Sequence, residues 1–238
     1  MTKIHCLRLS SGLEIEGPHL LVDRFFSEIG HPLYDLLPVA QDNILDPTCL
    51  VSPAYFLTYA PAFEGWRQIW AKKSEIEALL SSIPCETQLY DEDVPWEPLE
   101  RIFDAFMETP YFKLATTSKI LHKKRPKLIP ILDELVLNYY RNPIEHYVTE
   151  LNAFLIRKGD KVKFSAETFL DSGSGVRVVS KLIREDLRTN LGVLKQIRDE
   201  ISDRYDLTLL RILDIILWTN ARMMNSSLKP SRGSFPRR

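Results

Sequence analysis

Apolar side chains recur every three or four residues along most of this sequence, the spacing that places them on one face of an α-helix. The clearest runs lie at residues 74–83, 96–107, 128–139, 144–155, 176–201 and 206–218. Proline, glycine or a polar loop separates one run from the next, and Asp46-Pro47 is a typical helix start. The pattern therefore predicts an all-α fold of about eight to ten helices in a single domain.

The two ends of the chain depart from the helical pattern. Residues 1–17 alternate weakly around a Ser-Ser-Gly turn, which indicates a small β-hairpin. Residues 225–238 carry four basic residues and no acid, so we expect a disordered tail after a helical domain at 1–224. The interval 159–175 is polar and contains glycine, and we expect a surface excursion whose Ser-Gly-Ser-Gly sequence at 172–175 is a flexible turn.

Composition and charge are those of an ordinary soluble globular protein. Of 238 residues, 45% are hydrophobic and 26% are charged, and the formal net charge is −1. A nucleic-acid partner would therefore need a local basic patch. Three widely spaced cysteines, Cys6, Cys49 and Cys85, argue against a disulfide framework and fit a reducing cytoplasm. Because Arg211 and Asp214 interrupt the longest apolar segment, we expect no membrane span.

No motif for a metal or a cofactor occurs in the sequence. The five histidines lack the H-x-x-H and H-E-x-x-H spacings of metal sites. There is also no G-x-G-x-x-G, Walker lysine loop or G-x-S-x-G. We therefore predict neither a metal ion nor a cofactor.

The most unusual chemistry lies in residues 116–133, TTSKILHKKRPKLIPILD, which we call the basic elbow. Residues 109–132 hold six lysines and arginines and no carboxylate. The Arg-Pro step favours extended backbone, which could present Lys123, Lys124 and Arg125 outward to phosphate groups of DNA. The same run would also fit a solvated helix C-terminus, where the macrodipole favours cations. The predicted nucleic-acid contacts, within a basic segment at 113–127, are Lys119, His122, Lys123, Lys124, Arg125 and Lys127.

Two acidic positions could carry chemistry. Asp133 follows the Pro-Ile-Leu step, where it could cap the next helix or act as a catalytic base or electrostatic stabiliser. Asp214 lies three residues after Arg211 on an apolar helix, and this spacing predicts an ion pair that is structural rather than catalytic.

Three pieces of the chain, in this order, resemble a family of uncharacterised bacterial proteins catalogued as a domain of unknown function. They are EALLSSIP at 77–84, SKILHKKRPKLIPILDELV at 118–136 and LLRILDIILW at 209–218. The resemblance covers most of the chain and implies a single helical domain without an assigned activity.

The basic elbow is also similar to a segment of helix-hairpin-helix DNA glycosylases that leads from the hairpin's second helix to the catalytic aspartate. The Pro130-Ile131-Leu132-Asp133 step carries this resemblance, which implies Asp133 as the catalytic acid. The family's Gly-x-Gly turn, which holds a DNA phosphate, is replaced by the glycine-free TPYFKLATT. Ala115 occupies the position of the nucleophilic lysine of bifunctional members.

The sequence leaves three functions open. The first is a nucleic-acid-binding module that uses the cations of the basic elbow on phosphates. The second is a glycosylase-like enzyme in which Asp133 stabilises positive charge developing on a sugar. The third is a non-enzymatic interaction or regulatory protein, in which the same residues contact a protein or a small ligand.

Overall fold

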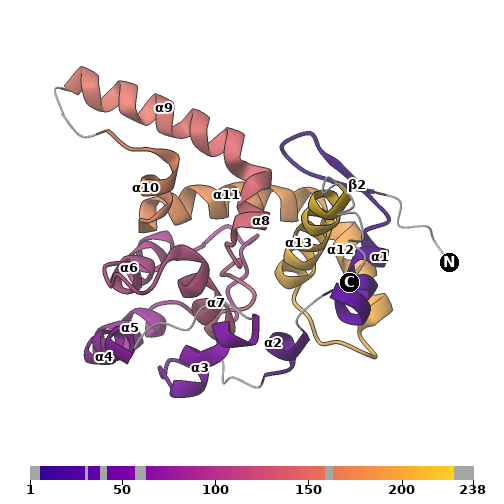
Figure 1. The fold of residues 1–238 in the computed structure, drawn as a ribbon, viewed down its shortest axis with the longest axis horizontal. Coiled ribbons are helices and arrows are strands. Elements are labelled where there is room, and N and C mark those ends of the chain that lie inside the picture. Colours follow the sequence, from indigo (N-terminus) through magenta and orange to yellow (C-terminus); the bar gives the residue numbers. More distant parts are fainter. Residues whose placement is uncertain (1–5, 30–31, 38–41, 57–62, 159–162, 228–238) are drawn as a thin grey trace, which may run out of the picture.

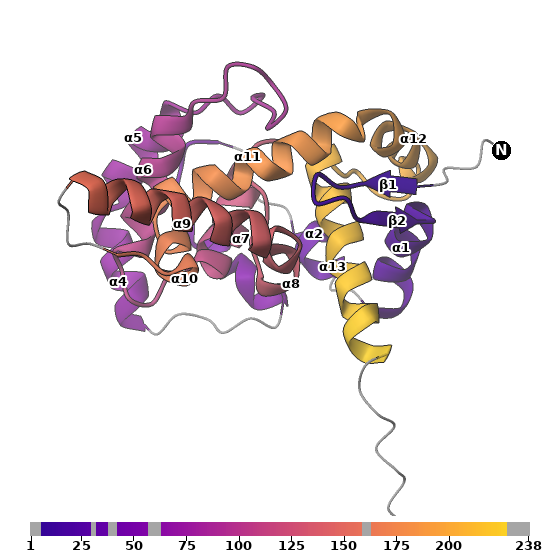
Figure 2. The same cartoon turned by 90° about the horizontal axis from the view of Figure 1, so that it is seen from above.

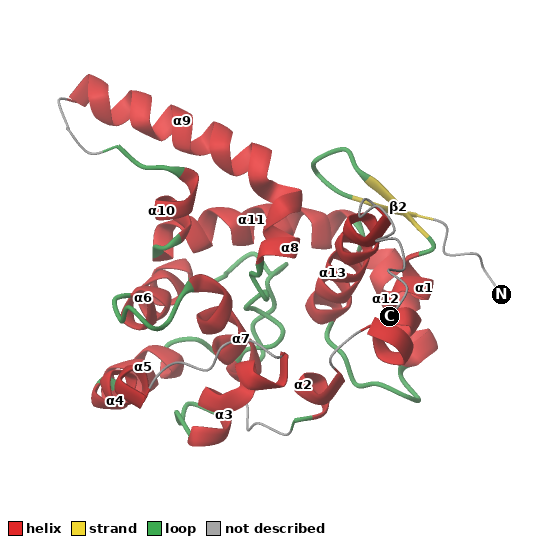
Figure 3. Ribbon diagram, viewed as in Figure 1, coloured by secondary structure: helices red, strands yellow, loops and turns green. Residues whose placement is uncertain are grey.

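The computed structural model describes residues 6–29, 32–37, 42–56, 63–158 and 163–227 (Figure 1). Most of these residues are helical, and the strands among them form one short hairpin (Figure 3). The predicted all-α fold with a small N-terminal hairpin is therefore confirmed.

The hairpin pairs β1 (Cys6–Arg8) with β2 (Glu14–Glu16) in antiparallel register, with Leu7 opposite Ile15. Gly12 adopts a φ of 84°, a conformation in which a side chain would be strained, so glycine is needed in this turn. Both Leu7 and Ile15 are buried, and they attach the hairpin to the helical core.

Two groups of helices lie on either side of the molecule, and α11 runs across both (Figure 2). One group combines the two ends of the chain, because α1 and α12 both pack against α13. The other group comes from the middle of the chain, where α6 packs against α5, α7 and α11. The end group contains α1 (Pro18–Arg24), the π-helical turn η1 (Phe25–Ile29), α12 (Leu191–Ile201) and α13 (Leu209–Ser227). The middle group contains α3 (Pro47–Val51), the 3₁₀ turn η2 (Ser52–Phe56), α4 (Phe63–Ala71), α5 (Lys73–Ser81), α6 (Trp96–Met107) and α7 (Leu114–Lys124).

Helix α13 lies in the centre of the core, as its nearly uninterrupted apolar sequence predicts. Ile212, Leu213, Ile215 and Ile216 are fully buried although they point in different directions around the helix. The helix continues to Ser227, so residues 225–227 of the predicted tail are helical, and residues 228–238 of that prediction lie outside the described residues.

Short elements connect the two groups of helices. They are α2 (Pro32–Leu36), α8 (Glu134–Leu137) and the 3₁₀ turn η3 (Asn138–Tyr140). From η3 the chain continues into α9 (Arg141–Lys158), which projects away from the rest of the molecule in Figure 1. Pro143 lies in the first turn of α9, where its missing N–H is tolerated, so the helix is not interrupted there.

The Ser-Gly-Ser-Gly sequence is the start of a long helix, and the expected flexible turn is wrong. After α10 (Ala166–Leu170), the Ser172 hydroxyl caps α11 (Gly173–Thr189) by accepting from the Gly175 N–H at 3.1 Å. A Cβ atom on Gly173 would lie 2.3 Å from the backbone oxygen of Glu100. Glycine is therefore required because α11 begins in direct contact with α6.

Candidate functional site

The basic elbow is mostly buried inside the protein. Lys119, His122, Lys124 and Arg125 are at most 6% exposed, and Lys123 and Lys127 are half-buried. The expectation that the elbow presents its cations outward is therefore wrong. The physical reason is that backbone carbonyls and carboxylates from distant segments surround the cations.

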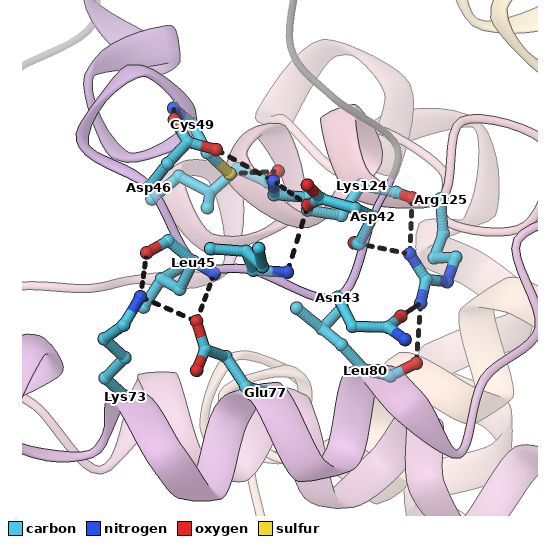
Figure 4. A network of polar contacts seen from close by, with 12 residues as sticks. Asp42, Asn43, Leu45, Asp46, Cys49, Lys73, Glu77, Leu80, Lys124 and Arg125 are labelled. Atoms are coloured by element: carbon cyan, nitrogen blue, oxygen red, sulfur yellow. Dashed lines mark hydrogen bonds and ion pairs between the residues drawn. The ribbon is translucent and has the colours of Figure 1, made fainter.

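Arg125 is fully buried, and its hydrogen bonds connect two segments of chain to the elbow (Figure 4). Its guanidinium donates to the backbone oxygens of Leu80 at 2.6 Å and Ile83 at 2.7 Å, at the end of α5. It also donates to the Asp42 backbone oxygen at 3.2 Å and to the Asn43 side-chain oxygen at 2.5 Å. A planar guanidinium suits such a set of acceptors, so Arg125 has a structural role here.

Lys124 forms a buried charge cluster beside Arg125. Its Nζ lies 3.0 Å from an Asp42 carboxylate oxygen and 2.9 Å from an Asp46 oxygen. Partial burial opposes ionisation of both carboxyls, but hydrogen bonds from Lys124 lower the pKa of Asp42 and Asp46 below the usual range. Asp46 also caps α3 by accepting from the Cys49 N–H at 2.9 Å. Lys124 thus joins α7 to the start of α3.

On the other side of the elbow a polar cavity of about 490 Å³ opens between α2, the C-terminal end of α7 and the start of α13. We call it the polar cavity. Its charged wall combines three cations with two carboxylates. The residues that line it are Tyr34, Asp35, Leu37, His122, Lys123, Pro126, Lys127, Asp206, Leu207, Thr208 and Arg211.

Lys123 is a cation of this cavity that forms no ion pair in the described part of the chain, and the charge of nearby Asp35 offsets only part of the effect of burial on its pKa. Its ammonium donates to the backbone oxygens of Leu37, at 3.1 Å, and Tyr34, and it lies 4.3 Å from the centre of the Tyr34 ring. Within the described ranges, no carboxylate lies within ion-pair distance of it. Burial lowers the pKa of Lys123 to about 8, so it remains largely protonated at neutral pH.

The side chain of His122 lines the same cavity and is uncharged. Its Nδ1 lies 2.6 Å from the Ile129 backbone oxygen, and because a carbonyl only accepts, Nδ1 carries the proton and Nε2 is left as an acceptor. Burial lowers the pKa of His122 to about 3. The imidazole is therefore uncharged at neutral pH.

Arg211 is held by two carboxylates. It donates to both oxygens of Asp35, each at 2.7 Å, and to Asp214, so the predicted Arg211–Asp214 ion pair is confirmed. Burial raises the pKa of Asp214 to about 7, although Arg211 opposes this. Across the described residues, the second oxygen of Asp214 has no hydrogen-bond partner.

Asp133 caps its own helix. Its carboxylate accepts from the Val136 N–H at 3.2 Å, and the side chain is half-buried. Burial lowers the pKa of Lys119, and the negative charges of Asp133 and Asp214 oppose that effect. Lys119 thus lies close enough to Asp133 and Asp214 for their charges to favour its protonated form. The catalytic role of Asp133 stays a prediction.

Sequence reasoning missed Tyr34 and Asp42, which meet the elbow from segments more than 80 residues away, and Asp35, which meets Arg211 from a helix 176 residues away. The sequence gives little indication of the two aspartates, since an acidic residue near a short helix is common on protein surfaces.

Among the described residues, no group of three His, Cys, Asp or Glu side chains could hold a metal ion. None of the helices in the same ranges is long and apolar enough to cross a membrane.

Comparisons with known proteins give one match. A family model described as "Family of unknown function (DUF6308)" matches residues 21–221, which include the whole elbow and the polar cavity. No curated protein and no solved structure matches the chain.

Proposed function

The chain belongs to the DUF6308 family, whose description carries no function, and we propose from the geometry that it binds a small anionic ligand in the polar cavity. The ligand would carry a carboxylate or phosphate group. This is the small-ligand form of the third function that the sequence leaves open.

The environment of the Lys123 ammonium is the observation that supports the proposal. A half-buried ammonium that forms no ion pair is unfavourable unless negative groups neutralise it, and the charge of Asp35 does so only in part. Two of its three N–H donors meet carbonyls, which leaves one for a ligand. Arg211 contributes less, because Asp35 already neutralises it.

His122 indicates which anionic ligands would fit the cavity best. Its neutral imidazole offers Nε2 as an acceptor on a wall of the cavity. A ligand with a hydroxyl or N–H beside its anionic group would therefore fit better than a bare anion. We expect a hydroxy acid or a phosphorylated small molecule of a size suited to about 490 Å³.

The test is calorimetric titration of the protein with inorganic phosphate and with malate. Lys123→Met should weaken binding of the tighter probe at least tenfold, because it removes the charge and keeps the stem. The matched control is Lys127→Met, which removes another cation of the same wall that is paired with Glu86 at 2.6 Å. We expect less than a threefold effect from this control.

Circular dichroism melting of each variant separates loss of binding from loss of folding. If neither probe binds the wild type, or if Lys123→Met binds as well as the wild type, the proposal is wrong.

Nucleic-acid binding is the competing outcome. A DNA duplex titrated at two salt concentrations would bind with an affinity that falls as salt rises if the elbow contacts phosphates. Base release from damaged duplexes that disappears in Asp133→Asn would instead support the glycosylase-like enzyme. With Lys124 and Arg125 committed to internal contacts, we expect no such binding at moderate salt.

A further inference from the structure

A second cavity, of about 440 Å³, lies at the opposite end of α7 from the polar cavity. We call it the α7–α10 groove. It lies where the N-terminal end of α7 meets α8, α9 and α10. Its lining residues are Lys113, Leu114, Ala115, Leu132, Glu134, Leu137, Arg141, Ile144, Glu145, Ala166, Glu167, Leu170 and Asp171.

Aliphatic side chains make up the interior of the groove. Leu114, Leu132 and Ile144 are buried, and Leu137 and Leu170 are half-buried beside them. A surface of this kind stabilises a bound hydrocarbon group by removing it from water.

Charges around the groove are predominantly negative. Four carboxylates and two cations line it, a difference of two negative charges. Lys113 faces Asp171 at 3.4 Å, so these two largely cancel. Arg141 donates to the Asn138 side chain at 2.9 Å.

Three exposed glutamates remain without a cation. Glu134, Glu145 and Glu167 form no ion pair with any residue of the described ranges. They come from three different helices, α8, α9 and α10, which meet at this groove. A ligand with a positive group would therefore gain electrostatic attraction at the rim, while a negative one would be repelled.

We propose that the α7–α10 groove binds a small organic cation with an apolar body, such as an amine, amidine or guanidinium attached to a hydrocarbon group. The body would contact Leu114, Leu137 and Leu170, and the cation would lie near Glu134 and Glu167. This site is separate from the polar cavity, whose wall has the opposite excess of charge.

Three probes of nearly equal shape test the proposal: benzamidine, benzamide and benzoate. Binding is followed by protein-observed NMR shifts and by calorimetry. We expect benzamidine to bind about fivefold more tightly than benzamide, as two exposed charge contacts would give. Benzoate should bind more weakly than either.

The double variant Glu134→Gln/Glu167→Gln should remove most of the preference for benzamidine over benzamide and leave benzamide binding unchanged. Both side chains are exposed, so the variant is expected to fold. The matched control is Glu185→Gln, an exposed glutamate on α11 that does not line the groove. Lys123→Met should leave benzamidine binding intact, which separates this proposal from the first.

The proposal is overturned if benzamidine does not bind, if benzamide binds equally well, or if the double variant keeps the preference. Self-association would also overturn it. In that case light scattering would show a dimer that Leu137→Glu dissociates, and a second copy of the chain would cover the groove.

Discussion

Replacement of Arg125 by lysine tests whether this residue stabilises the fold or binds phosphate. The substitution keeps the positive charge, so a purely electrostatic contact with phosphate would be little affected. It removes the planar array of donors that meets Leu80, Ile83 and the Asp42–Asn43 segment. The two hypotheses for Arg125 therefore predict different results.

The size of the effect follows from the acceptors that are left without donors. A lysine ammonium has one nitrogen, and it cannot reach the Leu80 and Ile83 carbonyls and the Asn43 side chain together. Two buried acceptors without partners cost roughly 2 to 6 kcal/mol, at about 1 to 3 kcal/mol each. Compared with a total stability of about 5 to 15 kcal/mol, this is a large loss.

Urea denaturation followed by circular dichroism measures that loss. The matched control is Arg157→Lys, at an exposed arginine that, within the described ranges, donates only to the Ala153 backbone oxygen one turn earlier in α9. We expect a change within about 0.5 kcal/mol for the control. An Arg125→Lys protein within about 1 kcal/mol of the wild type would refute the reasoning, and weaker DNA binding at unchanged stability would favour a phosphate contact.

Two further predictions concern pH and packing. Because burial lowers the pKa of His122 from 6.5 to about 3, its contribution to stability is complete above pH 6.5 and is lost as pH falls toward 3. Between pH 7 and pH 5, the free energy of unfolding of His122→Gln should therefore fall by about 2 kcal/mol less than that of the wild type, as measured by urea denaturation. An equal decrease in the two proteins would contradict this. Gly173→Ala should destabilise the protein by about 1 to 3 kcal/mol or more, because its Cβ would overlap the Glu100 backbone. Gly192→Ala on α12 meets no atom within 4 Å and should be neutral or stabilising by up to about 1 kcal/mol; similar melting temperatures for both alanine variants would refute the packing argument.

Helix positions were largely predictable because they depend on local sequence. The apolar periodicity of residues 96–107 corresponds to α6, whose Leu99, Ile102 and Phe106 are buried as the spacing requires. The Asp46-Pro47 step is a true helix start, and its carboxylate makes the expected cap. Where the prediction failed, at the Ser-Gly-Ser-Gly sequence, contact with α6 decided the outcome.

The two partners of Arg211 differ in whether the sequence could predict them. The partner three positions away was predicted from the helical repeat, and it is present. Asp35, which takes two hydrogen bonds from the same guanidinium, comes from a helix 176 residues earlier. Spacing along one helix contains no information about such a partner.

The sequence by itself determined the helices, their buried faces and the concentration of cations in the elbow. Only the tertiary structure decided what those cations contact. Lys124 and Arg125 are next to Lys123 in the chain, yet they bind α5 and the start of α3 while Lys123 lies on the wall of the polar cavity. The reason is that charge is a property of each residue, whereas its partners are set by where distant carbonyls and carboxylates lie after folding.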